Sequence, residues 1–93
     1  MCSFILAMAK KKEILSLKEL DATPELKLIG KRIRQLRKQM GYSSYETFAN
    51  EHDIHRVQWG RYEQGLDLYT STLIKITRIL GVSLRDFFNE GFE

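Results

Sequence analysis

Apolar residues recur at helical spacing through most of the chain, beginning near residue 24. Between 25 and 40 they are separated by three, four, three and four positions, which predicts one helix with a single buried face. This stripe consists of Leu26, Ile29, Ile33, Leu36 and Met40. Thr23 as N-cap and Pro24 as the first helical residue predict the start of the helix, and Gly41 predicts its end.

Two shorter helices are predicted next, with a tight turn between them. Ser43 and Glu46 match the S-x-x-E capping box, so a helix is expected to begin directly after Ser43. The turn is expected at 53–54 and the second helix over 56–64, with Gly65 as its C-terminal cap.

Two further helices are predicted in the last part of the chain. Thr70 or Ser71 is the expected cap of a helix that ends at Gly81, and Ser83 is the expected cap of a short final helix. Their apolar positions are Leu73, Ile76, Ile79 and Leu80 in the first and Leu84, Phe87 and Phe88 in the second. No segment carries a strand signal. The prediction is therefore an all-α fold of five helices in one domain, residues 24–93.

Residues 1–23 are expected to form an N-terminal arm outside that domain. Residues 10–22 allow about two turns of amphipathic helix, which is marginal alone, so the arm is either ordered by docking or a loose tail. The opening apolar run precedes its lysines and is too short for a secretory signal or for a membrane helix of about 20 residues. The single cysteine, Cys2, cannot form an internal disulfide. We therefore expect a cytoplasmic protein without membrane contact.

The predicted helix over 56–64 has two different sides. Ile54, Trp59 and Tyr62 are expected to pack inward. The side chains expected to face outward are Arg56, Val57, Gly60 and Arg61. A helix that is fixed by packing on its inner side, and that carries hydrogen-bond donors beside an apolar side chain on its outer side, suits the DNA major groove.

Charge is distributed unevenly along the chain, although the net charge is only +3. Six basic residues and one acidic residue give +5 between 25 and 40, whereas five acidic and two basic residues give −3 between 41 and 69. Part of the positive charge forms a row on one face of the first predicted helix: Lys27, Lys31, Arg34 and Lys38. This row is expected either to face a phosphate backbone or to be a solvated helix face.

Four strings of residues carry a resemblance to a known family: IRQLRKQMG, FANEHDI, WGRYEQG and LIKITRILGVSLRDFF. On these strings, from about residue 26 to residue 88, the chain resembles the helix-turn-helix domain of phage repressors and Cro, the family of bacterial Xre-like regulators. The resemblance implies a lambda-repressor-like fold, sequence-specific binding of double-stranded DNA as a homodimer, and transcription regulation, most simply as a repressor.

The resemblance also implies roles for individual residues. Arg37 and Glu63 match an arginine and a glutamate that pair in relatives and fix the reading helix on the scaffold. The residues that it assigns to DNA contact are Ser44, His55, Arg56, Val57, Gly60 and Arg61. One departure concerns the loop after the reading helix, which lacks basic residues and carries Asp67, a side chain expected to repel phosphate.

Other functions have less support in the sequence. His52 and His55 lack the acidic or cysteine partners of a metal site, and no catalytic constellation or phosphate-binding loop is visible, so we expect neither an enzyme nor a cofactor. The main alternative is a protein-interaction module, such as the antitoxin of a toxin-antitoxin pair. Internal ion pairs of Arg56 and Arg61 would favour that alternative.

Overall fold

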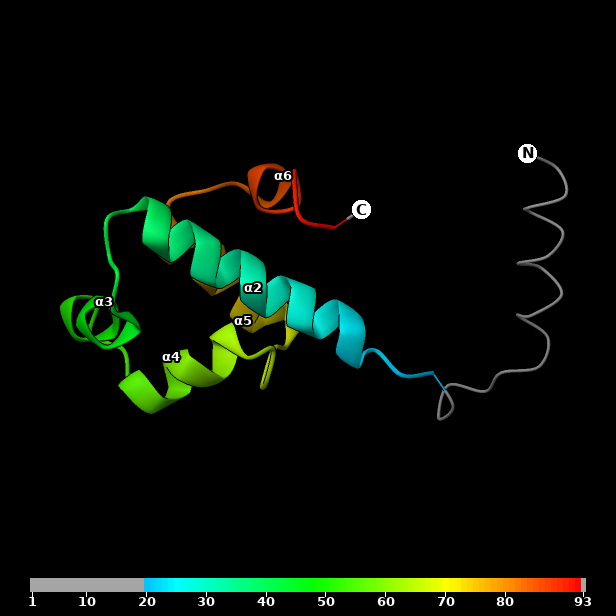
Figure 1. Cartoon of the computed structure of the whole chain (residues 1–93), viewed down its shortest axis with the longest axis horizontal. Coiled ribbons are helices and arrows are strands. Elements are labelled where there is room, and N and C mark those ends of the chain that lie inside the picture. The colour runs from blue at the N-terminus through cyan, green and yellow to red at the C-terminus, as the bar shows by residue number, and fades with distance from the viewer. Residues whose placement is uncertain (1–19, 93) are drawn as a thin grey trace, which may run out of the picture.

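Five α-helices form the part of the chain that the computed structural model describes, residues 20–92 (Figure 1). They are α2 (Thr23–Gln39), α3 (Tyr45–Glu51), α4 (Arg56–Glu63), α5 (Thr70–Leu80) and α6 (Leu84–Phe87). Residues 20–92 contain no strand, which confirms the all-α prediction. None of the described helices is both long and apolar enough to cross a membrane. The arm predicted for 1–23 lies almost entirely outside the described residues.

The start of α2 differs from the prediction by one residue. Ala22 is the N-cap, and Thr23, which was predicted to be the cap, is already helical. The Thr23 amide instead donates to Asp21 Oδ1 at 2.9 Å, so an aspartate two residues upstream satisfies this free amide. Hydrogen bonds from Thr23, first from its side chain and then from its amide, lower the pKa of the Asp21 carboxyl.

Two other helix starts can be compared with their predicted caps. The N-cap of α5 is Tyr69, so the prediction of Thr70 or Ser71 is wrong, and no side chain caps this helix. Ser83 does cap α6, since its Oγ accepts the Asp86 amide at 3.0 Å. Extended backbone at Tyr69 and Ser83 decides where each helix begins, whether or not a hydroxyl is present.

The core lies where α2 crosses the other helices. Its fully or nearly buried side chains are Ile33, Leu36, Phe48, Ala49, Trp59, Ile76, Leu80 and Phe87. Figure 1 shows α2 running across the molecule, with α5 behind it and with α4 and α6 on opposite sides. Met40 was predicted to complete the buried stripe of α2, but it is 41% exposed because the helix ends at Gln39.

Two glycines allow α2 and α4 to approach each other closely. A Cβ on Gly30 would lie 2.6 Å from both the Glu63 carbonyl oxygen and the Gly65 nitrogen. A Cβ on Gly65, whose φ is +83°, would lie 2.5 Å from the Leu26 carbonyl oxygen. The backbones are therefore in direct contact at this crossing, and a side chain at either position would separate them.

A buried arginine attaches α6 to α2. Arg32 is 7% exposed, and it donates from Nε to the Phe87 carbonyl oxygen at 2.7 Å and from Nη2 to the Asp86 carbonyl oxygen at 2.6 Å. A third bond runs from Nη1 to Gln35 Oε1 at 2.7 Å. This side chain thus ties α2 to two carbonyl groups near the end of α6.

Replacing Gly30 by alanine is expected to destabilise the protein, although alanine favours a helix interior. Overpacking against backbone atoms costs about 1–3 kcal/mol, which outweighs a propensity gain of about 1 kcal/mol. The measurement is urea unfolding followed by circular dichroism. Gly60→Ala is the matched control, because its Cβ would meet only the Tyr45 ring, 3.3 Å away, and that ring can move. Equal stability of the two variants would contradict the close crossing of α2 and α4.

Candidate nucleic-acid interface

Helices α3 and α4 are joined by a turn that fixes the angle between them. The Ile54 amide donates to the Ala49 carbonyl oxygen at 2.8 Å, which closes the turn. Asp53 has a φ of +56°, a backbone conformation that aspartate adopts more readily than most residues. The partly buried Ile54 packs against the core directly after it. The turn predicted at 53–54 is present.

The N-cap of α3 is Ser44, not Ser43. Ser44 has extended backbone, and its Oγ accepts the Thr47 amide at 3.4 Å. The prediction of Ser43 as the cap, and with it the capping box of Ser43 and Glu46, is therefore wrong. Ser44 was also assigned to DNA contact, and its hydroxyl oxygen is the acceptor of this capping bond.

The inner side of α4 is formed by aromatic residues. Trp59 is fully buried and packs on Phe48, with ring centroids 4.8 Å apart. Tyr62 meets the Trp59 ring edge to face at 5.9 Å. Phe48 in turn stacks on His52 at 4.2 Å, so α3 and α4 share one aromatic cluster. This cluster fixes the side of α4 that faces the core.

An ion pair between α2 and α4 completes the attachment. Arg37 Nε donates to Glu63 Oε2 at 2.7 Å and Arg37 Nη2 to Glu63 Oε1 at 3.0 Å. The two side chains are only 4% and 9% exposed. Trp59 Nε1 also donates to Glu63 Oε2, at 2.6 Å, and Arg37 Nη1 donates to the Tyr42 carbonyl oxygen at 2.7 Å. The pair implied by the family resemblance is thus formed, with additional bonds that satisfy both charges.

The connector between α2 and α3 is fixed at a second point. The Tyr42 hydroxyl donates to Glu51 Oε1 at 2.8 Å, and this hydrogen bond, with smaller effects of desolvation and of the Glu51 charge, raises the pKa of Tyr42. Tyr42 therefore remains a neutral donor at physiological pH and ties the connector to the end of α3.

The outer side of α4 is open to solvent at its first residues. Arg56 and the preceding His55 are exposed, and Val57 is 55% exposed. The Arg56 side chain has no hydrogen bond or salt bridge with another residue of the described part of the chain. His55 occupies the N-cap position without capping through its side chain.

Gly60 lies in the middle of the same side but is only partly accessible. The ring of Tyr45 from α3 occupies the space beside it, 3.3 Å from where a Cβ would be. A glycine here can either make space for a neighbouring side chain or let the backbone of a ligand approach closely. The contact with Tyr45 favours the first explanation.

Arg61 is held by a residue from the loop that follows α4. Its Nε donates to Asp67 Oδ2 at 2.7 Å, while the two side chains remain 51% and 40% exposed. Gln58 Nε2 reaches the same oxygen at 3.5 Å. Asp67 was expected only to repel phosphate, and its contact with Arg61 was not predicted.

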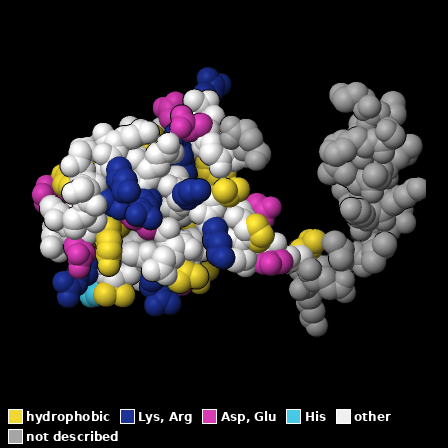
Figure 2. Space-filling model, viewed as in Figure 1, with side chains coloured by type: hydrophobic (Ala, Val, Ile, Leu, Met, Phe, Trp, Pro, Cys, Tyr) yellow, Lys and Arg dark blue, Asp and Glu magenta, His cyan; other side chains and the backbone are white. Residues whose placement is uncertain are grey.

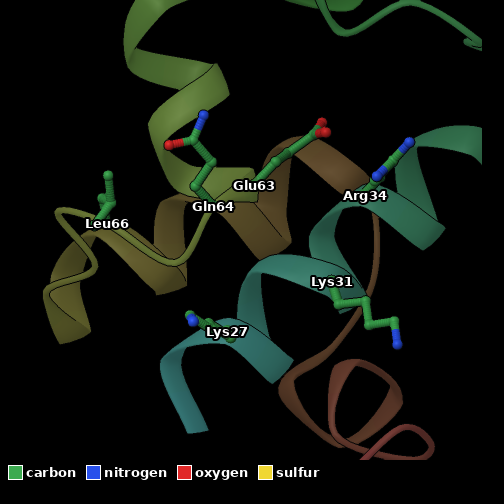
Figure 3. A pocket seen from close by; sticks show the side chains of 6 residues that line it. All are labelled: Lys27, Lys31, Arg34, Glu63, Gln64 and Leu66. Carbon is green, nitrogen blue, oxygen red and sulfur yellow. The ribbon is translucent and has the colours of Figure 1, made fainter. Parts of the chain in front are cut away.

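The basic row of α2 borders a hollow beside the end of α4. This hollow has a volume of about 540 Å³. In Figure 3, Arg34 and Glu63 lie at one end of it and Lys27 at the other. A neighbouring hollow of about 420 Å³ is also lined by Arg34 and extends to Ser44 and Gly60. Gln64 lines both hollows and lies one helical turn beyond Gly60. In Figure 2, Lys and Arg side chains gather over α2 and along the outer edge of α4. The hollows therefore connect the basic row of α2 with the end of α4, although both are also lined by the acidic Glu63.

Within 20–92 no group of three or more His, Cys, Asp or Glu side chains stands close enough to hold a metal ion. Comparisons with protein-family models, curated proteins and solved structures find no match to this chain.

Replacing Arg37 by alanine is expected to destabilise the protein by about 3–5 kcal/mol, since it leaves the Glu63 carboxylate buried without its partner. Arg61→Ala is the matched control: it removes an arginine from an exposed ion pair, which contributes about 1 kcal/mol or less. Urea unfolding of both variants provides the comparison. A loss below about 1 kcal/mol for Arg37→Ala would show that the pair does not hold α4 in place.

Proposed function

We propose that this protein binds double-stranded DNA in a sequence-specific manner and regulates transcription, most simply as a repressor. The observation that carries the proposal is the asymmetry of α4. Its inner side is fixed by Trp59 and by Glu63, whereas its outer side presents Arg56 and Val57 to solvent. A rigidly held helix with an exposed arginine beside an exposed apolar side chain is suited to reading base edges in the major groove.

The basic row of α2 supplies the second part of the proposal. Its four side chains, Lys27, Lys31, Arg34 and Lys38, are exposed, and none forms a salt bridge with a described residue. Neutralisation of phosphates by such cations provides most of the affinity of proteins for DNA and makes it dependent on salt. Arg34 is the member that lines both hollows, so it is the one placed nearest to the reading helix.

The Cro and repressor family remains the proposed relationship, based on the resemblance in sequence together with the helix-turn-helix of α3 and α4. Members of this type read two half-sites as a two-fold dimer, so a homodimer is part of the proposal. The exposed apolar side chains at α6, Leu84 at 47% and Phe88 at 43%, are the proposed contact.

Two observations favour a second function. The Nε of Arg61 is in an ion pair with Asp67, and the segment that contains α3 and α4 carries a charge of −3. Both features suit a protein-interaction module, such as an antitoxin that binds its toxin. Arg56 has no such pair, and this difference makes DNA binding the first proposal.

The test of DNA binding is selection of bound duplexes from a random pool at two salt concentrations. We expect enrichment of a palindrome with half-sites about ten base pairs apart. Arg56→Ala is expected to relax the preference at one base pair per half-site, at a cost of about 1–3 kcal/mol.

Two control variants distinguish the recognition of bases by α4 from electrostatic attraction to phosphate. Arg34→Ala is expected to weaken binding to all sequences alike, because it removes a phosphate contact. Arg78→Ala removes an exposed arginine near the end of α5 that leads to α6, so it is expected to leave selection unchanged. If the wild-type protein enriches no sequence and its binding disappears at modest salt, α4 is not a reading helix and a protein partner becomes the leading proposal.

The dimer proposal is tested by sedimentation velocity of Phe88→Ala against wild type. The exposed Phe88 ring is expected to contribute to the contact between two copies, so its removal should shift the population toward monomer. The loss of stability should be smaller than for a buried ring, although Phe88 also packs on Phe87 and Phe92. Phe87→Ala serves as the contrast, because Phe87 is fully buried and its loss should cost about 3–5 kcal/mol of stability. A wild-type protein that is monomeric at all concentrations would rule out this dimer.

A further inference from the structure

The loop after α4 folds back against the last turn of that helix. Gly65 is pressed against α2, and the Leu66 amide donates to the Arg61 carbonyl oxygen at 2.9 Å. Asp67 then adopts a φ of +57°, one of only two non-glycine residues within 20–92 in the left-handed region. The loop conformation therefore brings the Asp67 carboxylate beside Arg61, six residues earlier in the chain.

The contact uses only one edge of the guanidinium group. Arg61 donates to Asp67 from Nε, and none of its bonds to described residues involves Nη1 or Nη2. A guanidinium group has five N–H donors, so the terminal pair of nitrogens stays available for two parallel hydrogen bonds. A guanine edge offers two acceptors, O6 and N7, in the geometry that this pair fits.

Stability does not explain the contact well. Both side chains are about half exposed, and exposed ion pairs contribute little to folding. The Asp67 charge also opposes binding to phosphate, so it weakens attraction to DNA of any sequence. A carboxylate that adds little stability and lowers general affinity is best explained by an effect on the orientation of Arg61.

We propose that Asp67 is a positioning residue for base reading: it fixes Arg61 through Nε so that the two terminal nitrogens face a guanine in the major groove. The proposal rests on the proposed function and adds a specificity determinant outside the reading helix. Holding the arginine before binding lowers the entropy lost when it contacts the base, and it disfavours other orientations that would accept other bases.

Two substitutions at residue 67 distinguish the positioning of Arg61 from the effect of the Asp67 charge. Asp67→Gly removes the acceptor and suits the positive φ. Asp67→Asn removes the charge but keeps an oxygen that can accept the Arg61 Nε–H, and asparagine also tolerates this φ. Each variant is titrated with the selected operator, with an operator altered at the base pair that Arg61→Ala relaxes, and with unrelated DNA. Thermal unfolding verifies that both variants are folded.

For Asp67→Gly, we expect discrimination at the Arg61 base pair to fall and affinity for unrelated DNA to rise. Asp67→Gly should lower discrimination at the Arg61 base pair about tenfold, toward the value for Arg61→Ala, while binding to unrelated DNA becomes tighter. Asp67→Asn should bind unrelated DNA more tightly as well but keep most of the discrimination. The double variant Arg61→Ala with Asp67→Gly should lose no more discrimination than Arg61→Ala alone.

Other results would overturn the proposal in distinguishable ways. One such result is that the wild type selects an operator while Asp67→Gly shows unchanged or increased discrimination at the Arg61 base pair. This result would show that Asp67 restrains Arg61 instead of positioning it. Equal loss of discrimination in the asparagine and glycine variants would assign the effect to charge alone. If the wild type selects no sequence, or Arg61→Ala relaxes no base pair, the reading role of Arg61 fails and that of Asp67 fails with it.

Discussion

The ion pair between Arg37 and Glu63 is the interaction on which the placement of α4 depends. The Arg37 side chain comes from α2 and also holds the Tyr42 carbonyl of the connector, while the Glu63 carboxylate accepts a further bond from Trp59. Because both charges are almost excluded from solvent, neither is stable without the other. The pair therefore fixes the rotation of α4 about its own axis, and this rotation decides which residues face outward.

The pair in turn depends on how closely the two helices approach. Gly30 and Gly65 let the backbones of α2 and α4 touch, so the separation of the helices is set by main-chain contact and not by flexible side chains. An added side chain at Gly30 would push α4 outward and lengthen the contact between Arg37 and Glu63. Packing and electrostatics at this crossing are therefore coupled, and neither can be changed without affecting the other.

The sequence was sufficient for the local features of the fold and insufficient for the distant ones. Apolar spacing and glycine stops predicted five helices because these signals lie within each helix. The caps at Thr23 and Ser43 were misplaced by one residue, since the backbone conformation of the residue before each helix, and not its side chain, decides where the helix begins. Gly30 and Arg32 were missed because their partners lie more than 30 residues away in the chain. The Arg37–Glu63 pair was expected only through the family resemblance, and the contact of Arg61 with Asp67 depends on a backbone conformation that composition does not reveal.

Under the proposed function, affinity and selectivity arise on different helices. The segment from 41 to 69 is acidic, so attraction to phosphate has to come mainly from α2, with its charge of +5 between 25 and 40. The proposed reading side chains on α4 are themselves unequal: the Arg56 side chain has no partner among the described residues, whereas Arg61 is paired with Asp67. An arginine that is already ordered loses less entropy on contact, while a free one adapts to more than one base. Discrimination is therefore expected to be sharper at the base pair read by Arg61 than at the one read by Arg56. The close crossing of α2 and α4 keeps the basic row and both arginines in a fixed arrangement on one duplex.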